Sequence, residues 1–212
     1  MPDTQTIWLF CLAASVLIVI PGPAVLYIVA QSVGQGPKAG LVSASGVASG
    51  GLVHVVAAAI GLSGLLLSSA SLFSVVKFAG AAYLIYLGAR RLLGREASAL
   101  VAPTRGRSRR QLYRDGAVVN ILNPKTALFF YAFLPQFLDP DKGAVTLQAL
   151  VLGTIFVAIA LMSDSVWALA SGSAADWLKA RPLAATAERW VSGTVLIGLG
   201  ATAALTSAHR AK

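Results

Sequence analysis

Four ionisable side chains lie inside long apolar stretches of this sequence, namely His54, Lys77, Lys125 and Asp164. If these stretches cross a membrane, such groups are costly in hydrocarbon, and each becomes a candidate functional group. Asp164 could take up a proton or hold an ammonium group, or it could form a structural ion pair with Lys125. His54 could relay protons, although a buried histidine that donates to a backbone carbonyl is the simpler interpretation. Lys77 is near enough to the end of its stretch to reach the interface, which favours a structural role.

Two proline breaks interrupt apolar stretches at matching places in the two halves of the chain. Proline lacks a backbone donor and kinks or unwinds a helix, and freed backbone groups persist in a membrane only where protein or an aqueous cavity covers them. Paired broken helices therefore indicate the substrate site of a transporter.

The residues next to the breaks could bind the substrate. Asn120 and Asn123 could satisfy freed carbonyls or bind a substrate, and Lys125 with free N–H groups could receive a carboxylate. We expect the second break to carry more of the recognition. The predicted substrate-binding residues are Pro21, Gly22, Pro23, Asn120, Asn123, Pro124 and Lys125.

The composition predicts an all-α integral membrane protein. Only 12% of the 212 residues are charged and 57% are hydrophobic, whereas soluble domains have about 25% charged residues. The single cysteine, Cys11, provides neither a disulfide framework nor a cysteine metal site. Because no catalytic constellation, metal-ligand cluster or phosphate-binding glycine loop is present, we expect neither an enzyme nor a cofactor.

Uncharged runs long enough to cross a bilayer predict six transmembrane helices, of which the first and fourth are broken. Pro21 matches Pro124, and Gly40 matches Gly143, at the same offset of 103 residues. This correspondence predicts an inverted 3+3 repeat, with repeats at 1–93 and 115–212 joined by a basic linker at 94–114. The predicted spans are 7–33, 40–68, 72–92, 115–138, 146–171 and 190–207.

The distribution of basic residues predicts the orientation. Twelve lysines and arginines fall on the face of the central linker and three on the opposite face. Positive-inside bias then places the linker 94–114 in the cytoplasm and both termini outside. The basic residues of these loops, next to the lipid bilayer, account for the net charge of +9. We therefore expect no nucleic-acid partner.

The second predicted span is rich in small residues. Gly46 and Gly50 are spaced to let another helix backbone approach closely, so packing is the preferred interpretation. A binding role for Ser45 or Ser49 is secondary.

Four motifs, taken in order, resemble the LysE/RhtB family of bacterial amino-acid exporters (LysE-type translocators). They are Pro21-Gly22-Pro23, the small-residue second span, residues 77–88 and residues 120–125. The resemblance implies a multi-pass protein of the bacterial inner membrane that exports amino acids or close derivatives, of threonine, homoserine, leucine or basic type, against protons. A homodimer is compatible with the sequence. Export of another small solute or a metal ion, or a non-transporting accessory role in the membrane, remain as alternatives.

Overall fold

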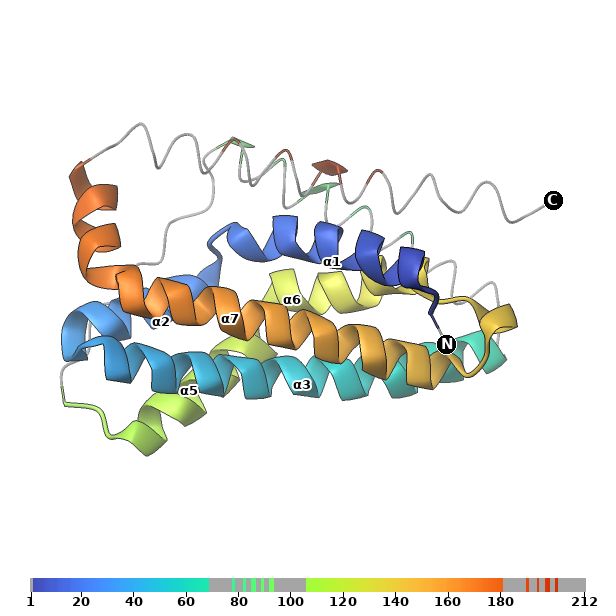
Figure 1. Ribbon diagram of the computed structural model, residues 1–212, viewed down its shortest axis with the longest axis horizontal. Coiled ribbons are helices and arrows are strands. Elements are labelled where there is room, and N and C mark those ends of the chain that lie inside the picture. The colour runs from blue at the N-terminus through green and yellow to red at the C-terminus, as the bar shows by residue number, and fades with distance from the viewer. Residues whose placement is uncertain are drawn as a thin grey trace.

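The computed structural model describes residues 2–68 and 106–180, together with single positions within 78–93 and 190–201 (Figure 1). Every element in the described part of the chain is a helix, as the sequence predicts. The predicted spans at 72–92 and 190–207 fall mostly outside the described residues. Lys77 lies outside them as well.

The first predicted break is present. Helix α1 (Thr4–Val19) ends at Ile20, and helix α2 (Pro23–Gln35) follows at an angle of 53°. Proline is well placed at the start of α2, because the first N–H groups of a helix have no partner within it. Pro21 and Pro23 thus end one helix and begin the next.

The second predicted break is also present. Helix α5 (Arg109–Ile121) is followed at 48° by a segment formed by α6 (Pro124–Leu128), a π-helix (Phe129–Phe133) and a 3-10 helix (Leu134–Phe137). Helix α5 begins six residues before the predicted span start at 115. The reason is a capping box, in which Ser108 and Gln111 each bond the other's backbone N–H.

Two long helices complete the described bundle. These are α3 (Pro37–Ser68) and α7 (Val145–Ala180), and a 3-10 turn (Pro140–Lys142) precedes α7. Their segments Pro37–Gly61 and Val145–Ser171 are long and apolar enough to cross a membrane. Each bent pair can supply one further span, which gives two to four candidate spans among the described residues.

The described helices of the two halves run in opposite directions. In Figure 1, α1 and α2 run from right to left and α5 and α6 from left to right, while α3 and α7 are also antiparallel to each other. The similar bends of 53° and 48° support the match of Pro21 with Pro124. The match of Gly40 with Gly143 is wrong, because Gly40 lies inside α3 and Gly143 lies in a loop with φ 111°.

Helices α3 and α5 approach at backbone distance. A Cβ added at Gly46 would lie 2.0 Å from the Tyr113 carbonyl oxygen, and one at Gly50 would lie 2.4 Å from the Ala117 carbonyl oxygen. The packing role predicted for these two glycines is therefore confirmed.

The serines of the same stretch are bonded within the protein. Ser45 Oγ donates to the Leu41 carbonyl at 3.0 Å, and Ser49 Oγ lies 3.1 Å from the Ser45 carbonyl oxygen and also pairs with the Tyr113 hydroxyl. These contacts support helix packing rather than substrate binding at this stretch.

A cluster of buried phenylalanines joins α1, the π-helix and α7. Phe10 and Phe129 have ring centroids 5.7 Å apart, and Phe129 stacks on Phe156 with centroids 4.2 Å apart. All three side chains are at most 6% exposed. This cluster packs the irregular segment after the second break against α1 and α7.

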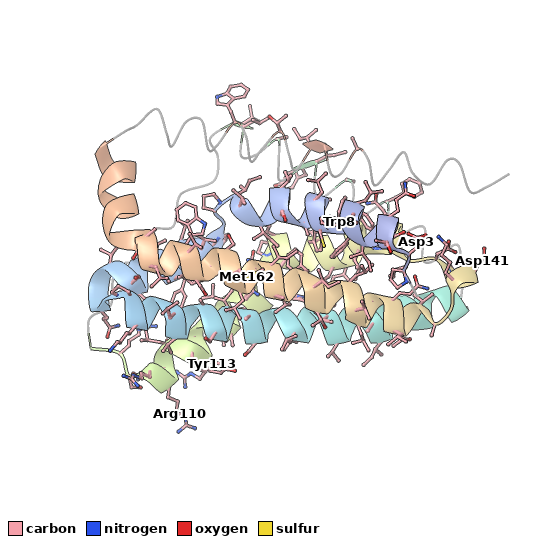
Figure 2. All side chains as sticks on the ribbon, viewed as in Figure 1. Asp3, Trp8, Arg110, Tyr113, Asp141 and Met162 are labelled. Carbon is pink, nitrogen blue, oxygen red and sulfur yellow. The ribbon has the colours of Figure 1, made fainter. Side chains whose placement is uncertain are left out.

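Opposite charges mark the two ends of the bundle. Figure 2 shows Arg110 at one end, and Asp3 and Asp141 at the other. At the acidic end, the Lys142 ammonium donates to the Asp3 carboxylate at 2.6 Å, and this bond holds the pKa of Asp3 well below its usual range. The N-terminus and the loop before α7 therefore lie at the same end, as the predicted orientation requires.

Candidate functional site

A cavity of about 60 Å³ lies between the two helix breaks. Its walls include five of the residues that the sequence predicts for the site: Gly22, Asn120, Asn123, Lys125 and Asp164. These residues come from both breaks and from α7. The remaining lining residues are Leu17, Ile18, Ala24, Val25, Val47, Thr126, Phe156 and Ala160.

The prolines shape the breaks without lining the cavity. Pro21, Pro23 and Pro124 are absent from its walls, so their predicted part in binding is limited to the backbone that they redirect.

Asp164 contributes the one carboxyl group among the described lining residues. Its side chain is 5% exposed and has no hydrogen-bond partner in the part of the chain that the structure describes. Lys125 acts on it electrostatically. Buried polar groups in proteins nearly always have partners, so a buried carboxyl group facing a cavity without one is placed to receive a ligand or a proton.

Lys125 links the second break to the first. Its ammonium donates to the Ile20 carbonyl, at the C-terminal end of α1, where a positive charge is favourable. A Cβ added at Gly22 would lie 3.2 Å from Lys125 Cδ, so the glycine leaves the space through which this side chain passes. The lysine is therefore not simply placed at the start of α6, as the sequence suggests, but spans both breaks.

His54 donates to the backbone carbonyl that Pro124 cannot bond. In a continuous helix the N–H of residue 124 would bond the Asn120 carbonyl, and proline cannot do so. His54 Nε2 lies 3.0 Å from that carbonyl oxygen and donates to it, and the Asn123 N–H donates to the same oxygen at 3.0 Å. The simpler interpretation of His54, as a donor to the backbone, thus has a direct geometric basis, and His54 does not line the cavity.

The amide groups of Asn120 and Asn123 are bonded within the protein. Asn120 Nδ2 donates to the Val47 carbonyl at 2.8 Å, and Asn120 Oδ1 accepts from Thr126 Oγ1 at 2.8 Å and from Asn123 Nδ2 at 3.3 Å. Asn123 Oδ1 accepts from the Lys125 N–H at 3.1 Å, which caps α6. Thr126 was not predicted from the sequence, although its position three residues after Asn123 puts both on one helix face.

At the first break, the N-terminus of α2 has no side-chain cap. Gly22 provides no side-chain cap for α2, and Ala24 and Val25 in the first turn line the cavity. The N-terminus of a helix carries partial positive charge and free N–H groups that bind anions. The cavity therefore combines an anion-binding helix start and Lys125 with the carboxyl group of Asp164. Such a pair of opposite charges can hold a zwitterion.

Comparison with known proteins supports a transport role. The family model for the LysE type translocator matches residues 15–207. The chain is 32% identical to an uncharacterized membrane protein of Pseudomonas aeruginosa, with 91% of this chain and 92% of the relative covered. It is 28% identical to a leucine efflux protein of Salmonella choleraesuis (92% of both covered), and 30% identical to a homoserine/homoserine lactone efflux protein of Salmonella typhimurium (80% and 82% covered). No solved structure shows significant similarity. The match over nearly the whole chain shows that this membrane protein belongs to the LysE type translocator family.

Proposed function

We propose that the protein is a secondary active exporter of amino acids, with its substrate site in the cavity between the two breaks. The observation that carries this proposal is the Asp164 carboxyl group, which has no hydrogen-bond partner among the described residues and lines the same cavity as the uncapped start of α2. The leucine and homoserine efflux activities named for two relatives agree with it.

In the proposed binding mode, the substrate carboxylate is received at the first break. The N–H groups of Ala24 and Val25 and the ammonium of Lys125 supply the positive charge there. Asp164 holds the substrate ammonium group or takes up the coupling proton. The amides of the second break, already bonded to one another, act as the frame that holds Lys125 and α6 in place.

The cavity must open for this substrate to enter. Its volume is about 60 Å³, whereas pockets for small-molecule ligands typically measure roughly 300–1,000 Å³. We propose that the repeats 1–93 and 115–212 form the inverted 3+3 arrangement of six helices and rock against each other, with the linker 94–114 between them. The antiparallel course of the described halves supports this arrangement.

The proposed orientation has the linker in the cytoplasm and both termini outside the bacterial inner membrane. Its support is the excess of basic residues on one face and the separation of Arg110 from Asp3 and Asp141. Lys77 remains a candidate structural or functional residue of the third span.

The decisive experiment is counterflow in proteoliposomes with a panel of labelled amino acids, followed by uptake driven by a pH gradient. We expect counterflow of at least one amino acid and accumulation when a proton gradient is imposed. Counterflow of a divalent metal ion with none of any amino acid would favour metal export instead. If the folded protein exchanges no amino acid, the proposal is refuted.

The role of Asp164 is tested by Asp164→Asn, with Asp141→Asn, at an exposed position in the 3-10 turn before α7, as the matched control. A purely proton-coupling Asp164 predicts that the variant keeps counterflow and loses gradient-driven accumulation. An ammonium-binding Asp164 predicts that it loses both. Full gradient-driven uptake by Asp164→Asn would contradict both roles.

A further inference from the structure

The walls of the cavity are divided into a polar part and an apolar part. Asn120, Asn123, Lys125, Thr126 and Asp164 make up the polar part. The apolar part includes two buried side chains, Val47 and Phe156, at 4% and 6% exposure, and the small residue Ala160.

The amide and hydroxyl groups of the polar part already have protein partners. Asn120 Oδ1 accepts two hydrogen bonds, its Nδ2 donates to the backbone, and Thr126 Oγ1 and Asn123 Nδ2 both donate to Asn120. A substrate hydroxyl group directed at Val47, Phe156 and Ala160 would meet no side-chain hydrogen-bond partner there, and an unpaired polar group is costly in a buried site. The cavity thus offers charges for a carboxylate and an ammonium group in its polar part, and apolar side chains at Val47, Phe156 and Ala160 for the rest of a substrate.

Phe156, Ala160 and Asp164 lie at intervals of four residues along α7 and therefore share one face. Ala160 is about 6 Å from Asp164 along the helix axis, and Phe156 about 12 Å. Once the cavity has opened, a substrate whose ammonium group is at Asp164 can extend its side chain past Ala160 in the direction of Phe156. Phe156 itself is held by stacking on Phe129 and by an edge contact to Phe130, with centroids 5.2 Å apart, so it forms a firm end wall.

We propose that Val47, Phe156 and Ala160 form the subsite for the substrate side chain, and that this subsite selects amino acids with an aliphatic side chain over those with a hydroxylated or cationic one. The proposal rests on the proposed function, since it assigns the substrate class of the same cavity. A cationic side chain is disfavoured because Asp164 is the one acid among the described lining residues and is engaged by the α-ammonium group or the coupling proton.

The test is competition by unlabelled amino acids against labelled leucine in counterflow. Valine and threonine are the sharpest pair, because they have nearly the same shape and differ in one hydroxyl group. An apolar pocket discriminates such a pair by up to about 100-fold, so we expect half-maximal competition by valine at a concentration roughly 10 to 100 times lower than by threonine. Lysine should compete least.

A variant series places the selectivity at Ala160. Ala160→Leu should abolish leucine counterflow and retain that of glycine or alanine, while Ala160→Gly should admit phenylalanine. Ala158→Leu, at an exposed position on the same helix, is the matched control and should behave as the wild-type protein.

The outcomes separate the two proposals. Threonine competing as well as valine, or leucine counterflow unchanged in Ala160→Leu, would overturn the aliphatic subsite while amino-acid export stands. Absence of counterflow with every amino acid would overturn the proposed function and the subsite with it.

Discussion

Replacing Gly46 by alanine should force α3 and α5 apart. The added Cβ would lie 2.0 Å from the Tyr113 carbonyl oxygen and 2.9 Å from its Cα, so it meets backbone that cannot rotate away. A flexible side chain could move aside at little cost, but here one whole helix must shift.

The size of the shift follows from the contact distances. Ordinary contact begins at 3.4 Å, so the helices must separate locally by about 1.4 Å, and overpacking of this kind costs about 1–3 kcal/mol. The same interface holds the bonds from Asn120 Nδ2 to the Val47 carbonyl at 2.8 Å and from His54 to the Asn120 carbonyl at 3.0 Å. A separation of that size takes both bonds beyond the usual limit of about 3.2 Å. We therefore expect transport to fall together with stability.

The assay is equilibrium unfolding in mixed micelles with increasing denaturing detergent, together with leucine counterflow. Gly61→Ala is the matched control, since it lies in the same helix and its added Cβ meets nothing within 4 Å. This control should stabilise the protein slightly, because alanine is preferred over glycine in a helix by roughly 0.5–1 kcal/mol. If Gly46→Ala and Gly61→Ala proved equally stable, the close approach of α3 and α5 would be wrong.

Three further predictions concern single side chains. Lys125→Met keeps an unbranched side chain of similar length but removes the ammonium group, which donates to the Ile20 carbonyl and, in the proposed binding mode, receives the substrate carboxylate. We therefore expect the KM for the substrate to rise roughly tenfold, and an unchanged KM would exclude Lys125 from carboxylate binding. His54→Gln should preserve the pH profile of transport, and a shifted profile in this variant would restore the proton-relay interpretation. His54→Leu removes the hydrogen bond to the Asn120 carbonyl and should lower the free energy of unfolding by about 1 kcal/mol, as is typical of a hydrogen bond in a membrane protein. The lowered pKa of Asp3 means that its bond to Lys142 stabilises the protein at neutral pH and that this contribution is lost as the pH falls below about 4, the value for an unfolded aspartate. Asp3→Asn should remove this small acid-sensitive part of the unfolding midpoint, and added salt should weaken it in the wild-type protein; an effect insensitive to salt would contradict an exposed ion pair.

The sequence by itself determined the helical membrane class and selected five residues that line the proposed site. Apolar length and the scarcity of charge require membrane helices, and proline chemistry requires the two breaks, because both are properties of local sequence. The same local rules selected Gly22, Asn120, Asn123, Lys125 and Asp164, and the structure brings these five residues to one cavity. Ser108 and Gln111 also indicate the earlier start of α5, because they form a capping box. The predicted span start at 115 was based on apolar length, which does not detect a capping box.

Only the tertiary structure decided which partner each polar group has. Asn120 bonds Val47, 73 positions away in the sequence, and Lys125 reaches Ile20 across 105 positions. Hydrogen bonds form within about 3 Å, so pairing depends on how α3, α5 and the two breaks are packed, which the spacing of residues along the chain does not specify. This packing engages the amides of the second break with one another and leaves the start of α2 and the carboxyl group of Asp164 facing the cavity.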